Sequence, residues 1–223
     1  MFASYRMNMI QDSWQRSFRT KWKREHPELC LGERGSYENS DNEELRHCWS
    51  SLDWEHEAVR DQRLAVIEEI CSGYDVDGME LDFWRWPAFF KPTLEQKPVE
   101  QRHLDAMTDF MRRARGRMME IESERGRPLL LAPRVFDTLD VNRRMGLDVE
   151  TWLEEGLLDI LVVGGDYTYY SIPVADWAEI ARRYDVPLYV CLYRSTTVEQ
   201  DRAVTTYHSS FGSDGVYTFN FKL

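Results

Sequence analysis

The sequence lacks the motifs that mark the commonest cofactor and metal sites. It contains no GxGxxG or GxxxxGK[ST] loop, which argues against a dinucleotide-binding sheet and a P-loop. Its five histidines form no HExxH or HxH motif, and its four cysteines form no CxxC pair. Cys30 with His47 and Cys48 would supply only three of the four ligands of a structural zinc site. We therefore expect no cofactor and no metal, and a metal-dependent hydrolase is a distant alternative.

Long apolar runs and an excess of positive charge are also missing. No stretch approaches the roughly 18 consecutive apolar residues that a membrane span requires, and the first six residues do not form a signal peptide. Lys plus Arg number 28 against 39 Asp plus Glu, a net charge of -11. This charge argues against nucleic acid or an anionic membrane as the main partner. We expect a cytoplasmic protein, or a secreted one if a signal segment precedes this sequence.

The strongest pattern that is present runs from Tyr74 to Pro87. With the two-residue period of a strand, its centre has one face carrying Glu80 and Asp82 and an opposite face made of Met79, Leu81 and Phe83. Helical patterns flank it, and strands that alternate with helices indicate a parallel sheet. Both faces of such a sheet are covered, so a carboxylate inside it must be paired, hydrogen-bonded or functional.

The whole chain repeats this alternation. Strands are predicted at residues 2–6, 77–83, 129–134, 158–163, 188–193 and 215–221. Helices are predicted at about 57–74, 99–125, 149–155, 174–184 and 198–209. Six such units without a phosphate loop predict an α/β fold of the (β/α)8 TIM-barrel type that is incomplete, with its N-terminal units missing.

The predicted organisation is a single partial barrel over residues 1–223, with a long loop insertion at about 9–55. Loops of this length inside compact domains are uncommon and usually act as lids or binding loops. A solvated, partly helical insertion is the alternative interpretation.

Two acidic residues of the central strand are the first candidates for catalysis. Asp82 lies near the carboxyl end of the strand, where barrel active sites lie. Its alternative role is a buried ion pair with an arginine of a neighbouring strand. Glu80 lies one pleat deeper, where it would support Asp82 or pair with Arg6 or Arg134. Glycoside hydrolysis usually needs two carboxyl groups about 5 Å apart for retention and about 6.5 to 9.5 Å apart for inversion.

The second carboxylate and the substrate contacts are expected at other strand ends. Asp166 and Asp137 are further candidates for the carboxylate, and both also suit turn or capping positions. The substrate-binding candidates are Arg6, Asn8, Trp84, Arg85, Trp86, Arg134, Tyr167 and Arg194. Arginine can bind a carboxylate or an acidic sugar bidentately, and aromatic rings can stack on sugar rings. For the aromatic cluster from Trp84 to Phe90, packing under the long loop is the alternative.

The stretch from Glu57 to Trp86 resembles the glycosyl-hydrolase-like family often called family-ten-like. A helix that opens with Val59-Arg60-Asp61 and leads into Tyr74-Asp75-Val76-Asp77-Gly78-Met79 looks like the segment that ends in the fourth barrel strand of that family. More loosely, Ser4 to Asn8 looks like the end of its third strand, and the likeness extends to Gly146–Trp152. This resemblance implies that everything before the third strand is absent from the chain.

The run from Asp77 to Asp82 also looks like the Asp-Gly-x-x-x-Asp strand of several sugar-cleaving barrels. In those barrels the last Asp is the nucleophile or an electrostatic stabiliser. Chitinase-like barrels carry their catalytic Glu two residues further on, where this chain has Trp84. That departure argues against their substrate-assisted mechanism.

The resemblance implies a glycoside hydrolase that cleaves a glycosidic bond in an oligo- or polysaccharide by carboxylate acid/base chemistry. Two alternatives stay open: a catalytically inactive barrel that binds a glycan, and a truncated relative without a function of its own. An incomplete barrel leaves strand edges and apolar surface bare. A homodimer that covers the open edges is the expected way to protect them.

Overall fold

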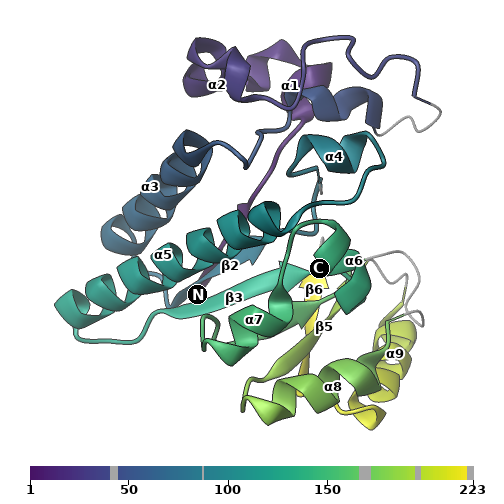
Figure 1. Ribbon diagram of the computed structural model, residues 1–223. Coiled ribbons are helices and arrows are strands. Elements are labelled where there is room, and N and C mark those ends of the chain that lie inside the picture. Colours follow the sequence, from purple (N-terminus) through teal and green to yellow (C-terminus); the bar gives the residue numbers. More distant parts are fainter. Residues whose placement is uncertain (41–44, 87, 166–171, 194–196, 220–223) are drawn as a thin grey trace.

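Six parallel strands form one sheet in the computed structural model, which describes residues 1–40, 45–86, 88–165, 172–193 and 197–219. The strands, in sheet order, are β1 (Phe2–Arg6), β2 (Gly78–Asp82), β3 (Leu130–Val135), β4 (Leu161–Val163), β5 (Leu188–Tyr193) and β6 (Gly215–Phe219). The sheet order equals the chain order, as in a barrel, whereas a doubly wound sheet reverses its order at a switch point. β2 and β3 run across the view in Figure 1 and β5 and β6 run steeply, so the sheet is strongly twisted. The fold is α/β, an incomplete TIM barrel, as the sequence predicts.

Five strands begin within one residue of the predicted position, and the fourth does not. β4 begins at Leu161 rather than at 158, because the N–H groups of Asp159 and Ile160 both donate to the Leu131 carbonyl, at 2.9 and 3.3 Å. The Asp159 carboxylate in turn accepts the Leu131 N–H at 2.7 Å and pairs with Arg115. The residues before β4 are therefore held by this shared carbonyl and by the Asp159 side chain, and not by a regular sheet ladder.

Helices cover one face of the sheet. They are α3 (Glu57–Gly73), α5 (Gln101–Arg125), α6 (Leu139–Arg144), α7 (Val149–Glu154), α8 (Val174–Arg183) and α9 (Val198–Ser210). All but α6 are predicted from the sequence. Helix α6 has six residues and its apolar Leu139 and Val141 are only half-buried, so it gives no periodic signal. The Thr138 hydroxyl caps it by accepting the Val141 N–H at 3.2 Å.

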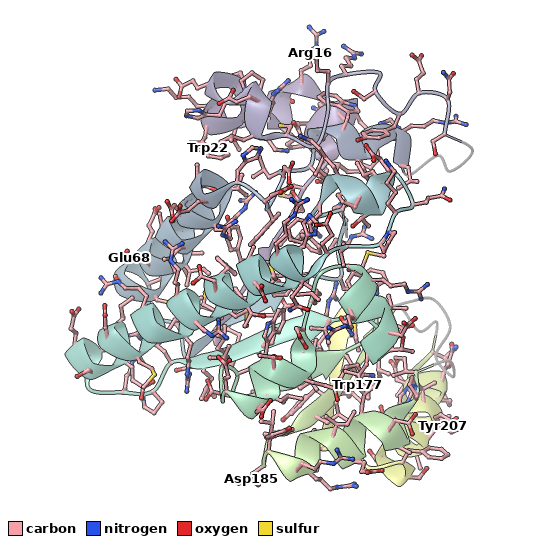
Figure 2. All side chains as sticks on the ribbon, in the orientation of Figure 1. Arg16, Trp22, Glu68, Trp177, Asp185 and Tyr207 are labelled. Carbon is pink, nitrogen blue, oxygen red and sulfur yellow. The ribbon has the colours of Figure 1, made fainter. Side chains whose placement is uncertain are left out.

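The main core lies between these helices and the outer face of the sheet. Phe83 contacts Trp152 of α7 with ring centroids 5.5 Å apart, and Trp54 meets Phe110 of α5 edge-on at 4.9 Å. These rings are completely buried, and Figure 2 shows side chains, including Trp177 of α8, throughout this layer. Burial of such large aromatic side chains is the dominant favourable contribution to the stability of a fold of this kind.

Helix α5 also binds its neighbours through arginines. Four of its arginines pair with carboxylates of other segments, at 2.5 to 2.7 Å: Arg112 with Glu155, Arg113 with Asp61, Arg115 with Asp159, and Arg117 with Glu68. Arginine in this part of the protein is thus regularly matched by an acidic partner.

The loops that follow β1 and β2 form a separate layer, which we call the cap, residues 8–56 and 84–95. It contains α1 (Gln11–Trp14), α2 (Lys21–Glu25), α4 (Lys91–Leu94) and the 3-10 turns η1 (Arg16–Phe18), η2 (Pro27–Leu29) and η3 (Leu45–Ser50). An antiparallel bridge joins Cys30 and Leu52, and a small core contains Ile10, Leu31, Cys48, Ala88 and Leu94. The cap lies beyond the ends of α3 and α5, at the top of Figure 1. The predicted insertion is therefore partly helical, and its proposed role as a lid stays a prediction.

Within the ranges described, no helix is long and apolar enough to cross a membrane.

Candidate active site

A buried group of charges lies on the inner face of the sheet, the face that the helices do not cover. The strand register places Asp82 opposite Arg6 on one side and opposite Arg134 on the other. Opposed residues of parallel strands point to the same face, so Glu80, Asp82 and Arg134 share this face. At most 3% of each of these three side chains is exposed. We call them the inner charge cluster.

Arg134 is the cation of this cluster. Its Nη2 and Nε lie 2.9 and 3.2 Å from Asp82 Oδ1, and its Nε lies 3.7 Å from Glu80 Oε1. The predicted alternative for Asp82, an ion pair with an arginine of a neighbouring strand, is thus what the structure contains. Of the two partners considered for Glu80, Arg134 forms the ion pair. The Arg134 guanidinium group thus pairs with two carboxylates in a site that is shielded from water.

Glu80 has an unusual electrostatic environment. Burial raises the pKa of the Glu80 carboxyl above its ordinary value, and the nearby Asp82 charge adds to this effect. A hydrogen bond with Ser4, the Arg134 charge and a hydrogen bond from Tyr217 oppose it. A carboxyl group that holds its proton more firmly than usual suits a general acid.

Tyr217 of β6 completes the cluster and is absent from the sequence-based candidates. Its hydroxyl donates to Glu80 Oε2 at 3.1 Å, and its ring lies 5.6 Å from the Arg134 guanidinium carbon. Burial raises the pKa of the Tyr217 hydroxyl well above its usual value, so it stays a donor. Burial likewise raises the pKa of the Cys191 thiol, 3.6 Å from Arg134 Nη1, to about 12. Cys191 is therefore a protonated neighbour and not a nucleophile.

The two carboxylate oxygens of Asp82 differ in their hydrogen bonds. Oδ1 accepts the Arg85 N–H at 3.0 Å as well as the Arg134 guanidinium. Oδ2 is buried and has no hydrogen-bond partner among the residues that the structure describes. Buried carboxylate oxygens are nearly always satisfied. Asp82 Oδ2 thus has unused capacity to accept a proton or to attack, and Glu80 Oε1 is likewise buried without a hydrogen-bond partner among the described residues.

Of the three candidates that follow β2, Trp84 contacts the inner charge cluster, whereas the side chains of Arg85 and Trp86 pack against each other and near Trp14 of α1. The Arg134 guanidinium carbon lies 5.2 Å from the Trp84 ring, and a Cβ added to Gly165 would lie 2.7 Å from that ring. Trp86 instead contacts Trp14 edge-on at 5.2 Å, with the Arg85 guanidinium 5.1 Å from its ring.

Asn8 is a packing residue in the structure. Its Nδ2 donates to the carbonyls of Leu52 and Ala88 at 3.1 and 2.6 Å, and its Oδ1 accepts the Leu52 N–H at 2.9 Å. The side chain is completely buried. In the structure its polar atoms join the backbone segments around Asn8, Leu52 and Ala88, and the expectation that Asn8 binds substrate stays a prediction.

The other candidates are placed as follows. Arg6 is half-buried at the carboxyl end of β1, beside Asp82. Asp137 is half-buried after β3, where its carbonyl accepts the Trp177 indole N–H at 2.7 Å. Asp166, Tyr167 and Arg194 lie outside the described residues. In the part of the chain that is described, no three His, Cys, Asp or Glu residues are grouped to hold a metal ion.

Comparisons with known proteins add little beyond the fold. No protein-family model and no curated protein matches the chain. Among solved structures, a glycoside hydrolase family 18 N-acetylglucosaminidase from Paenibacillus barengoltzii is 15% identical, with a TM-score of 0.45 over 63% of this chain and 46% of that one. A family 18 chitinase from Crocus vernus is 10% identical, with a TM-score of 0.41 over 73% of this chain and 56% of that one. The chain spans about half the length of each, and the family-ten-like resemblance stays a prediction.

Proposed function

We propose that the chain is a glycoside hydrolase whose carboxylate chemistry comes from Asp82 and Glu80. One observation carries the proposal: two buried carboxyl groups on one barrel face lie in different environments. Asp82 is paired with Arg134 and has an unsatisfied Oδ2, whereas burial raises the pKa of Glu80. Carboxyl groups kept in different protonation states are the basis of acid/base assignment in glycosidases.

The proposed roles follow from these environments. Asp82 is the nucleophile or base, acting through Oδ2. Glu80 donates the proton to the glycosidic oxygen as the bond to the anomeric carbon breaks, and water supplies the hydroxyl group of the new reducing end. Arg134 and Tyr217 position the two carboxyl groups, and Trp84 offers an aromatic wall for a sugar ring. Asp137 and Asp166 are the reserve candidates for the proton donor.

A second candidate function is glycan binding without turnover. It is favoured by Trp84, which stands where the resemblance to chitinase-like barrels expects a catalytic Glu. It is also favoured by the burial of the inner charge cluster, since at most 3% of each side chain is exposed. In this case the carboxylates stabilise the fold, and the glycan contacts the aromatic residues at the rim.

Substitution of Asp82 and Glu80 distinguishes hydrolysis from glycan binding without turnover. Reducing-end release is measured on a panel of oligosaccharides for wild type, Asp82→Asn and Glu80→Gln, with circular dichroism to verify folding. Asp140→Asn is the matched control, because Asp140 is 79% exposed and pairs with Arg144 on the same short helix. If the proposal is right, Asp82→Asn abolishes turnover, and Glu80→Gln retains activity on aryl glycosides whose leaving group needs no protonation.

Other outcomes have distinct meanings. Turnover that survives in Asp82→Asn contradicts the assignment of Asp82. Wild type that binds a glycan without cleaving it, with the same affinity in Asp82→Asn, supports the second candidate.

A further inference from the structure

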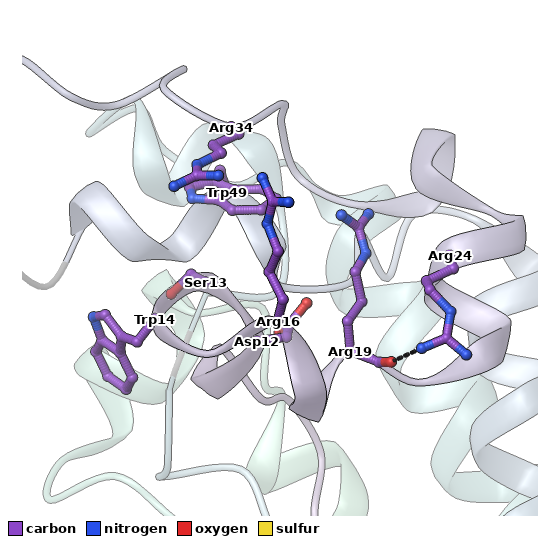
Figure 3. Close-up of a pocket in the computed structure, with 8 residues that line it drawn as sticks. All are labelled: Asp12, Ser13, Trp14, Arg16, Arg19, Arg24, Arg34 and Trp49. Carbon is purple, nitrogen blue, oxygen red and sulfur yellow. Dashed lines mark hydrogen bonds between the residues drawn. The ribbon is translucent and has the colours of Figure 1, made fainter.

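The cap contains a pocket of about 560 Å³ that the strand-end site does not use. Its walls include four arginines and two tryptophans: Arg16, Arg19, Arg24, Arg34, Trp14 and Trp49. Figure 3 shows Arg16 and Arg19 extending from neighbouring turns toward the side on which Trp49 and Arg34 lie. This volume falls within the range of pockets that hold small molecules. We call it the arginine pocket.

The arginines of this pocket differ from those of the helix layer. Within the described ranges none of the four forms an ion pair with a carboxylate, whereas four arginines of α5 each have one. Asp12, the acidic residue among the lining side chains, is buried and pairs with Lys23 at 3.0 Å, so its charge is already balanced. In a chain of net charge -11, the pocket is a local concentration of uncompensated positive charge. Such a site attracts an anion.

Two of these guanidinium groups are held in place by the protein. Arg24 Nη1 donates to the Arg19 carbonyl at 2.7 Å, and Arg19 Nη2 donates to the Lys23 carbonyl at 3.3 Å. The Arg19 guanidinium lies 5.9 Å from the centre of the Trp49 ring. Its Nε is buried and has no hydrogen-bond partner among the described residues. Donors fixed before binding cost less entropy to engage, so the pocket is prepared for an oxyanion.

The pocket continues toward a second cavity and toward the strand ends. The adjoining cavity of about 570 Å³ shares Ser13, Arg34 and Trp49 with it and adds Arg46 and His47 together with one acidic residue, Glu38. In the other direction Trp14 contacts Trp86, which lies next to Arg85, whose N–H binds Asp82. An occupant can therefore be longer than one small anion, and it would lie on the same end of the sheet as the inner charge cluster.

We propose that the arginine pocket binds an acidic saccharide through its carboxylate or sulfate groups. The negative charge of the ligand is inferred from the arginines, and its saccharide nature rests on the proposed function. The paired cavities suit a short chain better than a free ion. Guanidinium groups bind carboxylate and sulfate oxygens through two parallel N–H donors, which a neutral sugar cannot match.

The test compares probes of different charge on the full chain. Calorimetric titration uses a galacturonate hexasaccharide, a heparin-derived hexasaccharide, cellohexaose and inorganic sulfate. The test variant is Arg16→Gln with Arg34→Gln. The control is Arg144→Gln with Arg183→Gln, which removes two arginines that are also exposed and whose partners are Asp140 and Glu179.

The proposal expects an acidic hexasaccharide to bind more tightly than cellohexaose, with an affinity that falls as salt is added. The test variant should lose about tenfold or more in affinity, as is usual when charge-assisted hydrogen bonds are removed, and the control variant should keep it. Equal affinity for sulfate and for the acidic hexasaccharides overturns the saccharide assignment, since only the free ion would then be recognised. Unchanged binding of the acidic hexasaccharides by the test variant would contradict the assignment of their binding site to the arginine pocket.

Failure of this inference is distinguishable from failure of the proposed function. Asp82→Asn should bind the acidic probes as wild type does, because Asp82 does not line the arginine pocket. A chain without hydrolytic activity that still binds acidic saccharides through Arg16 and Arg34 would contradict the catalytic proposal alone.

Discussion

Arg134 is the residue on which the inner face of the sheet depends most directly. It is completely buried, and the two carboxylates that it serves are buried with it. Charges in such a place are tolerated only while they are paired, because desolvation of an ion is costly. The cluster is therefore a structural requirement of the sheet whether or not it is also catalytic.

Replacing Arg134 with leucine tests this dependence. We expect Arg134→Leu to lower the free energy of unfolding by about 3–5 kcal/mol at neutral pH, since it leaves two buried carboxylates without a cation. The loss should shrink in mildly acidic buffer, where Glu80, whose pKa is raised by burial, takes up a proton. Urea unfolding followed by circular dichroism measures both values. Arg144→Leu, on an exposed helix pair, is the control, and an equal effect in both variants would contradict the prediction.

Glu80 should make stability depend on pH. Its folded-state pKa lies above the ordinary value of 4.5, so the folded protein binds more protons than the unfolded chain just above that pH. The contribution of Glu80 to stability is thus complete below pH 4.5 and is lost as pH rises through its folded-state pKa. Glu80→Gln cannot titrate and should be at least as stable as wild type at neutral pH.

The measurement is urea unfolding of wild type and Glu80→Gln at a series of pH values from 4.5 to neutrality. Glu150→Gln, an exposed carboxylate on α7, is the matched control and should leave the pH profile unchanged. A Glu80→Gln variant that is clearly less stable than wild type at neutral pH would show that the ion pair with Arg134 outweighs burial.

At the scale of helices and strands, the sequence predicts those elements whose apolar residues recur at a regular spacing. Helix α5 is found because Met107, Met111, Ala114 and Met118 recur on one buried face. The helices of the cap are not predicted from the sequence, because they have only four or five residues and complete hardly more than one turn. The arginine pocket escapes prediction for the same reason: its four arginines converge through turns, and turns give no periodic signal.

The cap should depend on Asn8 for its attachment to the sheet. Asn8→Ala removes three hydrogen bonds and leaves buried backbone groups of Leu52 and Ala88 unpaired. Each such group costs about 1–3 kcal/mol, so the cap should open locally more often than in wild type. Hydrogen exchange measured by mass spectrometry should show faster exchange across residues 8–56. Asn39→Ala, at an exposed asparagine of the same insertion, should exchange like wild type.

At the scale of the molecule, the fold class follows from the sequence and the detail of the site does not. Alternating strands and helices without a phosphate loop are enough to predict a partial barrel. The ion pair of Asp82 with Arg134 is foreseen only as one alternative, because it depends on register between strands about fifty residues apart. Tyr217 is missed because its contact with Glu80 crosses the inner face from β6, at a separation of 137 residues.

The sheet has two open edges in the described part of the chain, since β1 and β6 each pair with one neighbour. Unpaired strand edges promote association, and a charge on an edge strand suppresses it. We expect the average mass of this chain to rise with concentration in light scattering. Thr218→Lys on β6 should reduce the rise, whereas Thr206→Lys on α9, also exposed, should not. A wild-type chain that is monomeric at every concentration would contradict this prediction.

The cap also affects the order in which the chain can fold. β1 pairs with β2 across the entire first insertion and α3, whereas β5 and β6 are separated only by α9 and its short connections. Closing a longer loop costs more entropy, and distant pairings slow folding. During synthesis β1 cannot pair with β2 until the residues after Tyr74 have left the ribosome. The small core of the cap includes Ala88 and Leu94, which follow β2 in the sequence, so the cap cannot be completed before β2 has been made. We therefore expect β1, β2 and the cap to assemble in one step, after the C-terminal strands, which have a much shorter loop to close.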